Sequence, residues 1–541
     1  MRSQITRREL LAGAGGMLGG LALRGQAASS AAAARPNVLF IMVDEMRADA
    51  MGCAGHPIVR TPNLDRLASQ GVRFANTYTV SPVCSPARAS AFTGRYAHVH
   101  GMIMNGAPAN NGEIYLPSIL KHYGYHTAIS GKLHYAPVRY GFGFDQFWSF
   151  SSEGPTPELG YSGFLKNKYG SPAKWPIVPG TCPWPEDALG RDYGVFKHAP
   201  EDFESNWITD RAIDYLRGRK NSAQPWFLFT SYLKPHSPSV QPKKYLEMYD
   251  PDKIPVPKLP PNAKEIRAQQ RGQRQRHYVY DERIIRMMRA AYYGLVTHTD
   301  EQIGRLLDEL EQLGMAGNTL VLFTADHGNM LGEHGRWFKG IMYEGSSHIP
   351  LIWREPAMRQ QSRPAPRDQG AGSRVESKLV ENTDLVPSIL ETIGVPVPEG
   401  VQGKSFVSLA RGRDPKWKDL AYAQLRDGMI RTPEFKFIDN SLEGSGPYEL
   451  YDMQKDLQEE NNLADSPKHR GLVEGFKKQL ARWRADKPAP VKIAGMKTPD
   501  YAVVSDEERR RLFRQAPDNQ EGGLPVGPAR KARKEARGKR D

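Results

Sequence analysis

The chain has 541 residues, enough for one large domain and a smaller one, and its 25% charged and 39% hydrophobic residues are ordinary for a soluble globular enzyme. The net charge of +14 would suit a nucleic-acid binder, but much of the excess lies at the two ends of the chain. Residues 530–541 hold seven basic and two acidic residues, and residues 1–35 hold five arginines and one glutamate. The body is therefore only modestly basic, which suits an anionic substrate and does not predict nucleic-acid binding.

Residues 1–35 are predicted to be a targeting segment. Paired arginines at Arg7 and Arg8 precede a mild apolar stretch rich in Gly and Ala, which ends in the small residues 27–34. This pattern resembles a twin-arginine (Tat) signal peptide, and the other reading is a disordered basic start. The Tat export machinery would deliver a folded protein to the periplasm or further outside. No segment reaches the length of a confident membrane span, so no stable membrane insertion is predicted.

Strands and helices are predicted to alternate along the chain. Apolar runs predict buried strands at residues 37–43, 125–130, 225–230 and 319–324. Helices are predicted behind a Thr61 cap with Pro62 in the first position, over 117–124, and over 299–313 before Gly314. This alternation predicts an α/β sandwich with a largely parallel sheet.

Polar residues follow each predicted strand at the point where it ends. Asp44 and Glu45 follow the first strand, Lys132 and His134 the second, His236 the third, and Asp326 and His327 the fourth. The carboxyl ends of parallel strands share one edge of a sheet, where ligands bind. Any one of these polar segments could simply be a solvated loop after a strand. Polar residues at the ends of all four strands are better explained by a shared site.

These residue types point to hydrolysis of a charged ester. Asp44, Glu45 and Asp326 are oxygen donors and His327 lies beside one of them, which favours Ca²⁺ or Mg²⁺ over zinc. The cationic side chains of Arg88, Lys132 and Lys339 could bind an anionic group. His134 and His236 are left for proton transfer. Residue types alone do not choose between a phosphate and a sulfate ester.

Cys84 is the least ordinary residue in the chain. It lies in the run Cys84-Ser85-Pro86-Ala87-Arg88, where Ser85 as a cap and Pro86 in the first position predict a helix towards Gly94. Cys84 would then lie at a helix N-terminus, where backbone N–H groups favour anions. The two other cysteines, Cys53 and Cys182, make no disulfide framework, although they could pair in an oxidising compartment.

Five segments together resemble the type I sulfatases, a formylglycine-dependent family of the alkaline-phosphatase-like superfamily. The run from Cys84 to Arg95 resembles the extended C-x-P-x-R…T-G-R signature. The other four resemble family elements in the right order: residues 131–134 (G-K-W-H, with Leu133 for tryptophan), 235–238 (P-H-x-P), 324–339 (S-D-H-G…K) and 449–464 (E-L-Y-D…N-L-A). The match spans roughly residues 36–465.

The resemblance implies an α/β/α sandwich with a large mixed, mostly parallel sheet. It implies a catalytic domain over residues 36–405 and a smaller α+β subdomain over 406–510 with a short antiparallel sheet. Residues 429–432 and 435–438 are candidates for two paired strands of that sheet. The basic tail 511–541 is predicted to be disordered.

The resemblance also implies a metal site and a modified residue. Cys84 would be oxidised to formylglycine by a formylglycine-generating enzyme. Ca²⁺ would be held by the modified Cys84 with Asp44, Glu45, Asp326 and His327. Two of these depart from the commonest family pattern, because Glu45 stands where a second aspartate is usual and His327 where asparagine is common.

Further roles follow from the same resemblance. Asp326 would act as the base that activates the nucleophile, and Lys132 and Lys339 would neutralise the sulfate oxygens. The nucleophile would be steadied by Arg88 and His134. The departing alcohol would be protonated by His236 or Lys339.

The sequence therefore predicts a sulfatase acting on an organic sulfate ester, with a sulfated carbohydrate as the preferred substrate. A phosphonate or phosphate monoester hydrolase of the same superfamily is the close alternative. A catalytically silent protein that binds sulfated glycans is a further one, and it would require Cys84 to remain a thiol. The basic stretch 264–276 reads either as a solvated helix face or as a binding segment for sulfated sugar.

Overall fold

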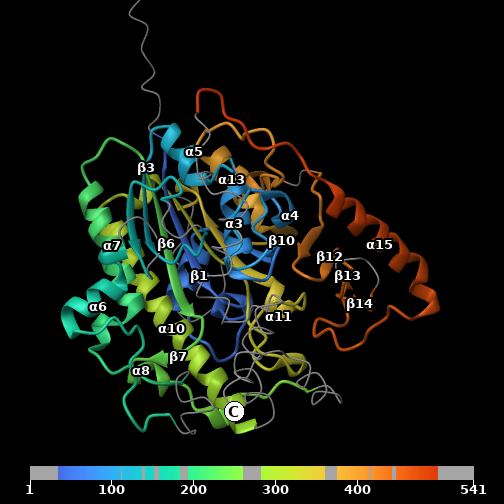
Figure 1. Ribbon diagram of the computed structural model, residues 1–541, viewed down its shortest axis with the longest axis horizontal. Coiled ribbons are helices and arrows are strands. Elements are labelled where there is room, and N and C mark those ends of the chain that lie inside the picture. The colour runs from blue at the N-terminus through green and yellow to red at the C-terminus, as the bar shows by residue number, and fades with distance from the viewer. Residues whose placement is uncertain are drawn as a thin grey trace, which may run out of the picture.

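The computed structural model describes residues 35–110, 112–136, 141–150, 157–182, 193–259, 282–359, 374–413, 416–441 and 446–496. An eight-stranded sheet runs through the centre of the molecule (Figure 1). In spatial order its strands are β10 (Arg374–Glu381), β2 (Val72–Tyr78), β9 (His348–Arg354), β8 (Thr319–Ala325), β1 (Asn37–Asp44), β6 (Trp226–Pro235), β3 (His126–Gly131) and β4 (Gln146–Ser149).

The sheet is mostly parallel, as the sequence predicts. β1 pairs in parallel with β6 on one side and with β8 on the other, and β3 pairs in parallel with β6 and β4. β9 runs antiparallel to both of its neighbours, β2 and β8, so the sheet is mixed. The four strands predicted from apolar runs are β1, β3, β6 and β8. β6 continues to Pro235, five residues beyond the predicted end.

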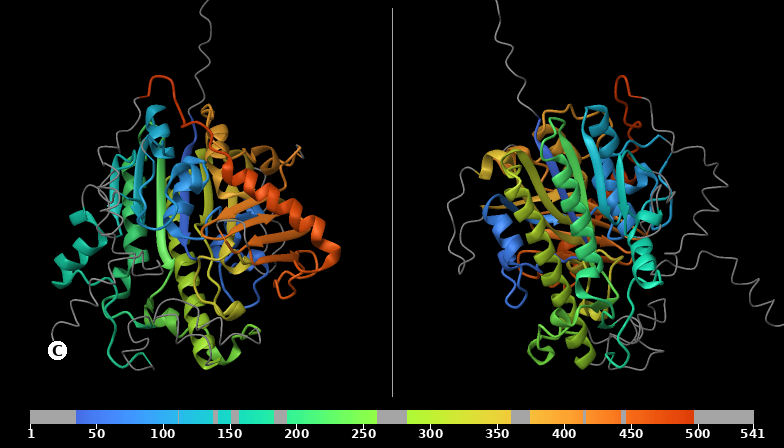
Figure 2. Two further views of the ribbon diagram at one scale, coloured as in Figure 1. Left: turned by 45° about the vertical axis from the view of Figure 1, so that its right-hand side comes forward. Right: turned by 90° about the vertical axis from the view of Figure 1, so that its left-hand side faces the viewer.

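Helices cover both faces of the sheet, which makes the fold an α/β/α sandwich (Figure 2). The side chains of β1 alternate between the two layers, with Leu39 and Ile41 in one core and Val38 and Phe40 in the other. The first layer includes α2 (Pro62–Ser69), α6 (Tyr161–Tyr169), α7 (Glu204–Arg219) and α10 (Glu282–Gln312). The second includes α3 (Cys84–Thr93), α5 (Leu116–His122), α13 (Leu385–Thr392) and α14 (Val407–Ala410).

Short elements complete the chain between these layers. Four short helices are α4 (Ala97–His100), α8 (Lys243–Leu246), α11 (Glu344–Ser347) and α12 (Pro356–Arg359). β5 (Tyr193–Val195) and β7 (Ser239–Gln241) form a separate two-stranded parallel sheet. No helix within the described residues is both long and apolar enough to cross a bilayer.

α2 begins at Pro62 behind Thr61 as predicted, but the caps of α2 and α3 differ from the sequence-based predictions. Thr61 precedes α2 but does not cap it through its side chain. The Asp300 carboxylate on α10 instead accepts the N–H groups of Asn63 and Leu64, so the cap comes from a distant part of the chain. α3 begins at Cys84 behind an extended Val83, so the predicted Ser85 cap is wrong by two residues.

α10 begins earlier than the sequence predicts. It begins at Glu282, whereas the predicted helix covered only residues 299–313. The added part is itself well buried, because Ile285, Ala291 and Leu295 pack into the protein interior. α3 does end at Gly94, which adopts the left-handed conformation with φ of 66° and so fits a glycine cap.

A second, antiparallel sheet lies beside the large one. Its strands in spatial order are β11 (Ala421–Gln424), β12 (Gly428–Arg431), β13 (Phe435–Asp439) and β14 (Tyr448–Asp452), and α15 (Arg470–Ala485) packs against it. β12 and β13 are paired as predicted. The tail 511–541, the stretch 264–276 and all of the signal segment except Arg35 lie outside the described residues.

Candidate active site

Strand ends and one helix N-terminus meet at the carboxyl edge of the large sheet. Asp44 is the last residue of β1, Asp326 directly follows β8, and Lys132 directly follows β3. Cys84, the first residue of α3, lies among them with 1% of its surface exposed. Because β1, β3 and β8 run parallel, their polar followers reach the same place from segments far apart in the sequence.

Four side chains form a donor set. Asp44, Cys84, Asp326 and His327 each place one ligand atom within 4.8 Å of the others. The Nδ1 atom of His327 lies 3.0 Å from the carbonyl oxygen of Gly328, an arrangement that assigns the ring proton to Nδ1. Nε2 then faces the Cys84 sulfur at 3.2 Å. Two carboxylates, a sulfur and an imidazole nitrogen packed this closely and fully buried suit a bound cation.

Arg88 joins the two carboxylates of this set. Its Nε lies 2.8 Å from Oδ2 of Asp326 and its Nη2 lies 3.3 Å from Oδ2 of Asp44. Its Nη1 donates to the backbone oxygen of Lys132 at 2.9 Å and to Oγ of Ser231 at 2.8 Å. Arg88 is 1% exposed, so this planar side chain is a fixed part of the site that orients both carboxylates.

Two lysines bring positive charge to residue 84. Lys132 Nζ lies 2.7 Å from Oδ2 of Asp44 and 3.8 Å from the Cys84 sulfur, and Lys339 Nζ lies 3.1 Å from that sulfur. Burial and the charge of Asp44 raise the pKa of the Cys84 thiol, but Lys132, Lys339 and His327 lower it more. The pKa of Cys84 is therefore held well below its usual value. Position 84 stabilises a negative charge.

Glu45 is not one of the four converging donors and lies next to Lys339, which contacts Cys84. Its Oε1 lies 3.1 Å from Lys339 Nζ and 3.9 Å from His236 Nε2, and its Oε2 accepts a hydrogen bond from Asn329 at 3.3 Å. Burial alone would raise the pKa of Glu45, but the nearby His236 and Lys339 lower it by more than burial raises it. The pKa of Glu45 is therefore lowered overall. The carboxylate of Glu45 thus faces the predicted proton-donating groups.

Both remaining histidines border this cluster. His134 adopts a left-handed backbone conformation with φ of 65°, and its carbonyl oxygen accepts a hydrogen bond from Oγ of Ser85 at 2.7 Å, next to Cys84. His236 follows the end of β6 and faces Glu45. Every predicted site residue therefore lies at this one edge of the sheet.

Residues that the sequence analysis did not single out complete the site. Asn105 accepts the backbone N–H of Ser85 at 2.9 Å and so satisfies a free donor at the start of α3. Ser231 holds Arg88, and Asn329 holds Glu45. Asn329 lies two residues after His327, which is a usable signal, but nothing in the local sequence around Asn105 announces its contact.

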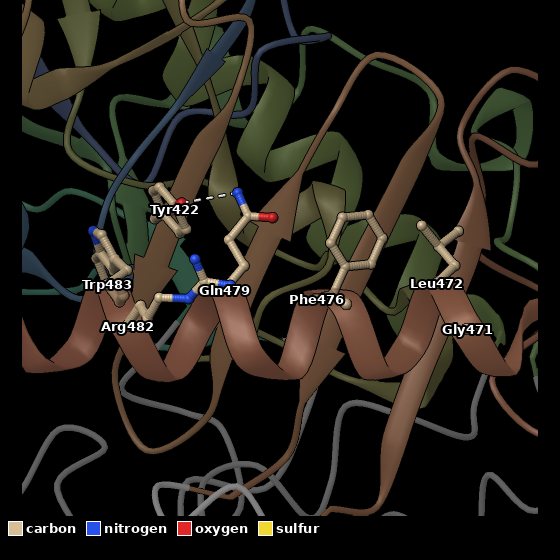
Figure 3. A pocket seen from close by; sticks show the side chains of 8 residues that line it. Tyr422, Gly471, Leu472, Phe476, Gln479, Arg482 and Trp483 are labelled. Carbon is tan, nitrogen blue, oxygen red and sulfur yellow. Dashed lines mark hydrogen bonds between the residues drawn. The ribbon is translucent and has the colours of Figure 1, made fainter.

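The other cysteines and two cavities lie apart from the donor set. Cys53 and Cys182 are not joined by a disulfide in this structure, so the possible pairing is not formed. A cavity of about 630 Å³ lies along α15, where Gln479 donates to the Tyr422 hydroxyl and Trp483 lies nearby (Figure 3). Another of about 1040 Å³ is lined by residues of both sheets and their loops. None of the four donors lines either cavity.

Comparison with known families agrees with this architecture. A sequence model described as sulfatase matches residues 36–395. A second model, described as the C-terminal part of N-sulphoglucosamine sulphohydrolase, matches residues 332–486. The first match covers well over half of the chain and includes all the donors above.

Individual relatives extend over most of the chain. The arylsulfatase of Clostridium perfringens is 31% identical over 471 residues, covering 83% of this chain and 94% of the relative. The N-acetylglucosamine-6-O-sulfatase of Bacteroides thetaiotaomicron is 28% identical over 504 residues, covering 79% and 82%. The crystal structure of a phosphonate monoester hydrolase of Agrobacterium radiobacter has the same fold, with a TM-score of 0.72, 24% identity, and 83% and 96% coverage.

The eight-stranded mixed sheet, the smaller antiparallel sheet and the near full-length relatives all agree with the resemblance found in the sequence. This chain belongs to the sulfatase family and is a sulfuric ester hydrolase.

Proposed function

We propose that this enzyme hydrolyses a sulfated carbohydrate to the alcohol and inorganic sulfate, with Cys84 as the precursor of a formylglycine nucleophile. The observation that carries the proposal is the setting of the Cys84 sulfur, which lies 3.1 Å from Lys339 Nζ and 3.2 Å from His327 Nε2. Formylglycine supplies a hydrated aldehyde, one oxygen of which can attack sulfur while the other allows sulfate to be released. A site that stabilises negative charge at residue 84 suits an ionised oxygen there.

We further propose that Asp44, Asp326, His327 and the modified residue 84 hold Ca²⁺, with Mg²⁺ as the second choice. The donor set supports a divalent cation, because buried carboxylates this close repel unless a positive charge lies between them. The cation would lower the pKa of the nucleophilic oxygen and polarise the ester. His327 adds one nitrogen to the oxygen donors, so the metal test compares Ca²⁺ with Mg²⁺ and Mn²⁺.

The chain's own side chains divide the remaining work. The Nζ atoms of Lys132 and Lys339 contact the Cys84 sulfur and would neutralise the sulfate oxygens that approach residue 84. Arg88 holds both carboxylates in place, and Asp326 would accept the proton of the nucleophile. His134 would steady the nucleophile from the side of Ser85.

The departing alcohol needs a proton as the S–O bond breaks. His236 would give it from Nε2, which faces the site, with Lys339 as the other candidate donor. Glu45 lies against both of these groups, with its Oε1 3.9 Å from His236 Nε2 and 3.1 Å from Lys339 Nζ.

We also propose a route of maturation and a domain division. A formylglycine-generating enzyme would act on Cys84 before Tat export, guided by residues 1–35, to the periplasm or outside. Residues 36–405 would form the catalytic domain and 406–510 the smaller subdomain, which contains β11 to β14 and α15. The saccharide preference rests on the basic body and on a relative named N-acetylglucosamine-6-O-sulfatase.

The test is a screen of defined sulfated saccharides for sulfate release, run beside an aryl sulfate and an aryl phosphonate ester. We expect release of inorganic sulfate from at least one saccharide with a kcat/KM well above that for the aryl sulfate. A large preference for the phosphonate would overturn the proposal in favour of a phosphonate monoester hydrolase. Absence of turnover, with an intact thiol at residue 84, would favour a glycan-binding protein.

A further inference from the structure

A buried lysine lies beneath the turn that carries His236. Lys234 is the penultimate residue of β6 and has none of its surface exposed. Its Nζ donates to the backbone oxygen of His236 at 3.1 Å and to that of Pro238 at 2.6 Å. The ammonium group of Lys234 is therefore hydrogen-bonded to the backbone of the turn on both sides of Ser237.

The charge of this lysine is balanced from a distant helix. Glu204, the first residue of α7, is also fully buried, and its Oε1 lies 3.8 Å from Lys234 Nζ. Trp175 Nε1 donates to the other oxygen of Glu204 at 2.5 Å, and Lys234 Nζ lies 5.1 Å from the centre of the Trp175 ring. The turn is thus tied to two segments that lie outside the site.

Such an arrangement is costly to keep as a source of stability alone. Burying two charged side chains carries a desolvation penalty, and a well-packed apolar pair of similar volume is often at least as stable. What an apolar residue at position 234 cannot do is donate to two carbonyl groups of the turn. The specific consequence of Lys234 is therefore the shape of the turn from residue 235 to residue 238.

The shape of this turn sets the direction of the imidazole. His236 Nδ1 lies 2.5 Å from the backbone oxygen of Ser237, so Nδ1 is the donor to the turn itself. Nε2 then faces the site, 3.9 Å from Oε1 of Glu45. If the two carbonyl groups were released, the ring would lose its fixed orientation.

We propose that Lys234 is a positioning residue for His236, and that it holds Nε2 towards the oxygen of the departing alcohol. This inference rests on the proposed role of His236 as the proton donor. Lys234 acts through the backbone of the turn, where its Nζ donates to the carbonyl oxygens of His236 and Pro238.

The test compares kcat for two aryl sulfates, 4-nitrophenyl sulfate and phenyl sulfate, whose alcohols differ in acidity. The less acidic phenol needs the proton more as it leaves, so weakening the proton donor costs more on phenyl sulfate. We expect Lys234→Met to lower kcat on phenyl sulfate on the order of 10–100-fold and on 4-nitrophenyl sulfate by less than about threefold. His236→Ala is expected to show the same selectivity, and the double variant Lys234→Met/His236→Ala no further loss.

Two controls separate positioning from stability. Glu204→Gln removes the counter-charge but leaves both carbonyl contacts of Lys234, so its thermal midpoint falls while its ratio of the two kcat values stays as in the wild type. Lys234→Met/Glu204→Gln removes both charges and so avoids an unpaired buried carboxylate if Lys234→Met alone fails to fold. This pair variant is expected to keep the selective loss on phenyl sulfate.

Equal losses on both esters, or losses that add to those of His236→Ala, would overturn the inference. The proposed function fails differently, through a wild-type enzyme that releases no sulfate and cleaves phosphonates instead. In that case the same variants are compared on 4-nitrophenyl and phenyl phosphonates, and the same selectivity is expected. The positioning role of Lys234 is thus tested whichever ester the enzyme prefers.

Discussion

Arg88 is the residue whose removal is expected to disturb the site most. It is 1% exposed and contacts two fully buried carboxylates, those of Asp326 and Asp44. Arg88→Met removes the charge and all four donated contacts while keeping an unbranched apolar side chain. Asp44 keeps Lys132 at 2.7 Å, so Asp326 is the carboxylate left without a cationic partner on that side.

The size of the effect follows from that single uncompensated charge. Breaking a buried ion pair by removing one partner costs about 3–5 kcal/mol, so we expect a loss of that size in the free energy of unfolding of the metal-free protein. Arg88→Lys keeps the charge but lacks the planar fork that reaches Asp326, Asp44 and Ser231 together. It should cost about 1–3 kcal/mol for the buried partners left unsatisfied.

The assay is urea unfolding of the full chain, followed by tryptophan fluorescence, with and without Ca²⁺. A bound cation would neutralise Asp326, so Ca²⁺ should stabilise Arg88→Met more than the wild type. Arg211→Met is the matched control, because that arginine pairs with Asp214 at the surface, where 39% and 52% of the two side chains are exposed, and little change is expected. An Arg88→Met variant within about 1 kcal/mol of the wild type would refute this account of the site.

Two further predictions concern metal binding and pH. Glu45→Gln should retain the wild-type metal content by elemental analysis and Asp326→Asn should lose it, because Asp326 is one of the four converging donors and Glu45 is not. Metal loss in Glu45→Gln would show that Glu45 is a ligand. Burial raises the pKa of Asp300 from 3.8 to about 7, so between these values the folded protein holds a proton that the unfolded chain releases. The stability of the wild type relative to Asp300→Asn should therefore fall between about pH 4 and pH 7 and level off above that, as measured by urea midpoints. A relative stability that rises over this range would show the opposite shift.

The sheet and its polar edge could be predicted because each depends on short stretches of sequence. The apolar run at 37–43 alternates its side chains between two cores, and Asp44 follows where the run stops. The same logic identified Asp326 behind β8 and Lys132 behind β3. These strands and the polar residues behind them could be predicted from the local sequence because a buried parallel strand must be apolar along its whole length.

Contacts between distant segments could not be read in the same way. The cap on α2 comes from Asp300, more than 230 residues further along the chain than the helix it caps. Nothing in the local sequence around Lys234 predicts its burial, and only the fold shows it inside the protein between Glu204 and the turn. Glu45 and Asp44 are neighbours in sequence, yet the Asp44 carboxylate belongs to the donor set and that of Glu45 does not, and Glu45 has a left-handed backbone with φ of 67°.

The central claim is that Cys84 is a precursor and that the enzyme works through the modified residue. The most direct measurement is sulfate release by purified enzyme preparations in which mass spectrometry of the peptide containing residue 84 gives the fraction present as aldehyde. Turnover should rise in proportion to that fraction and vanish in Cys84→Ala. Full activity in Cys84→Ala, or in protein that carries only the thiol at residue 84, would contradict the account.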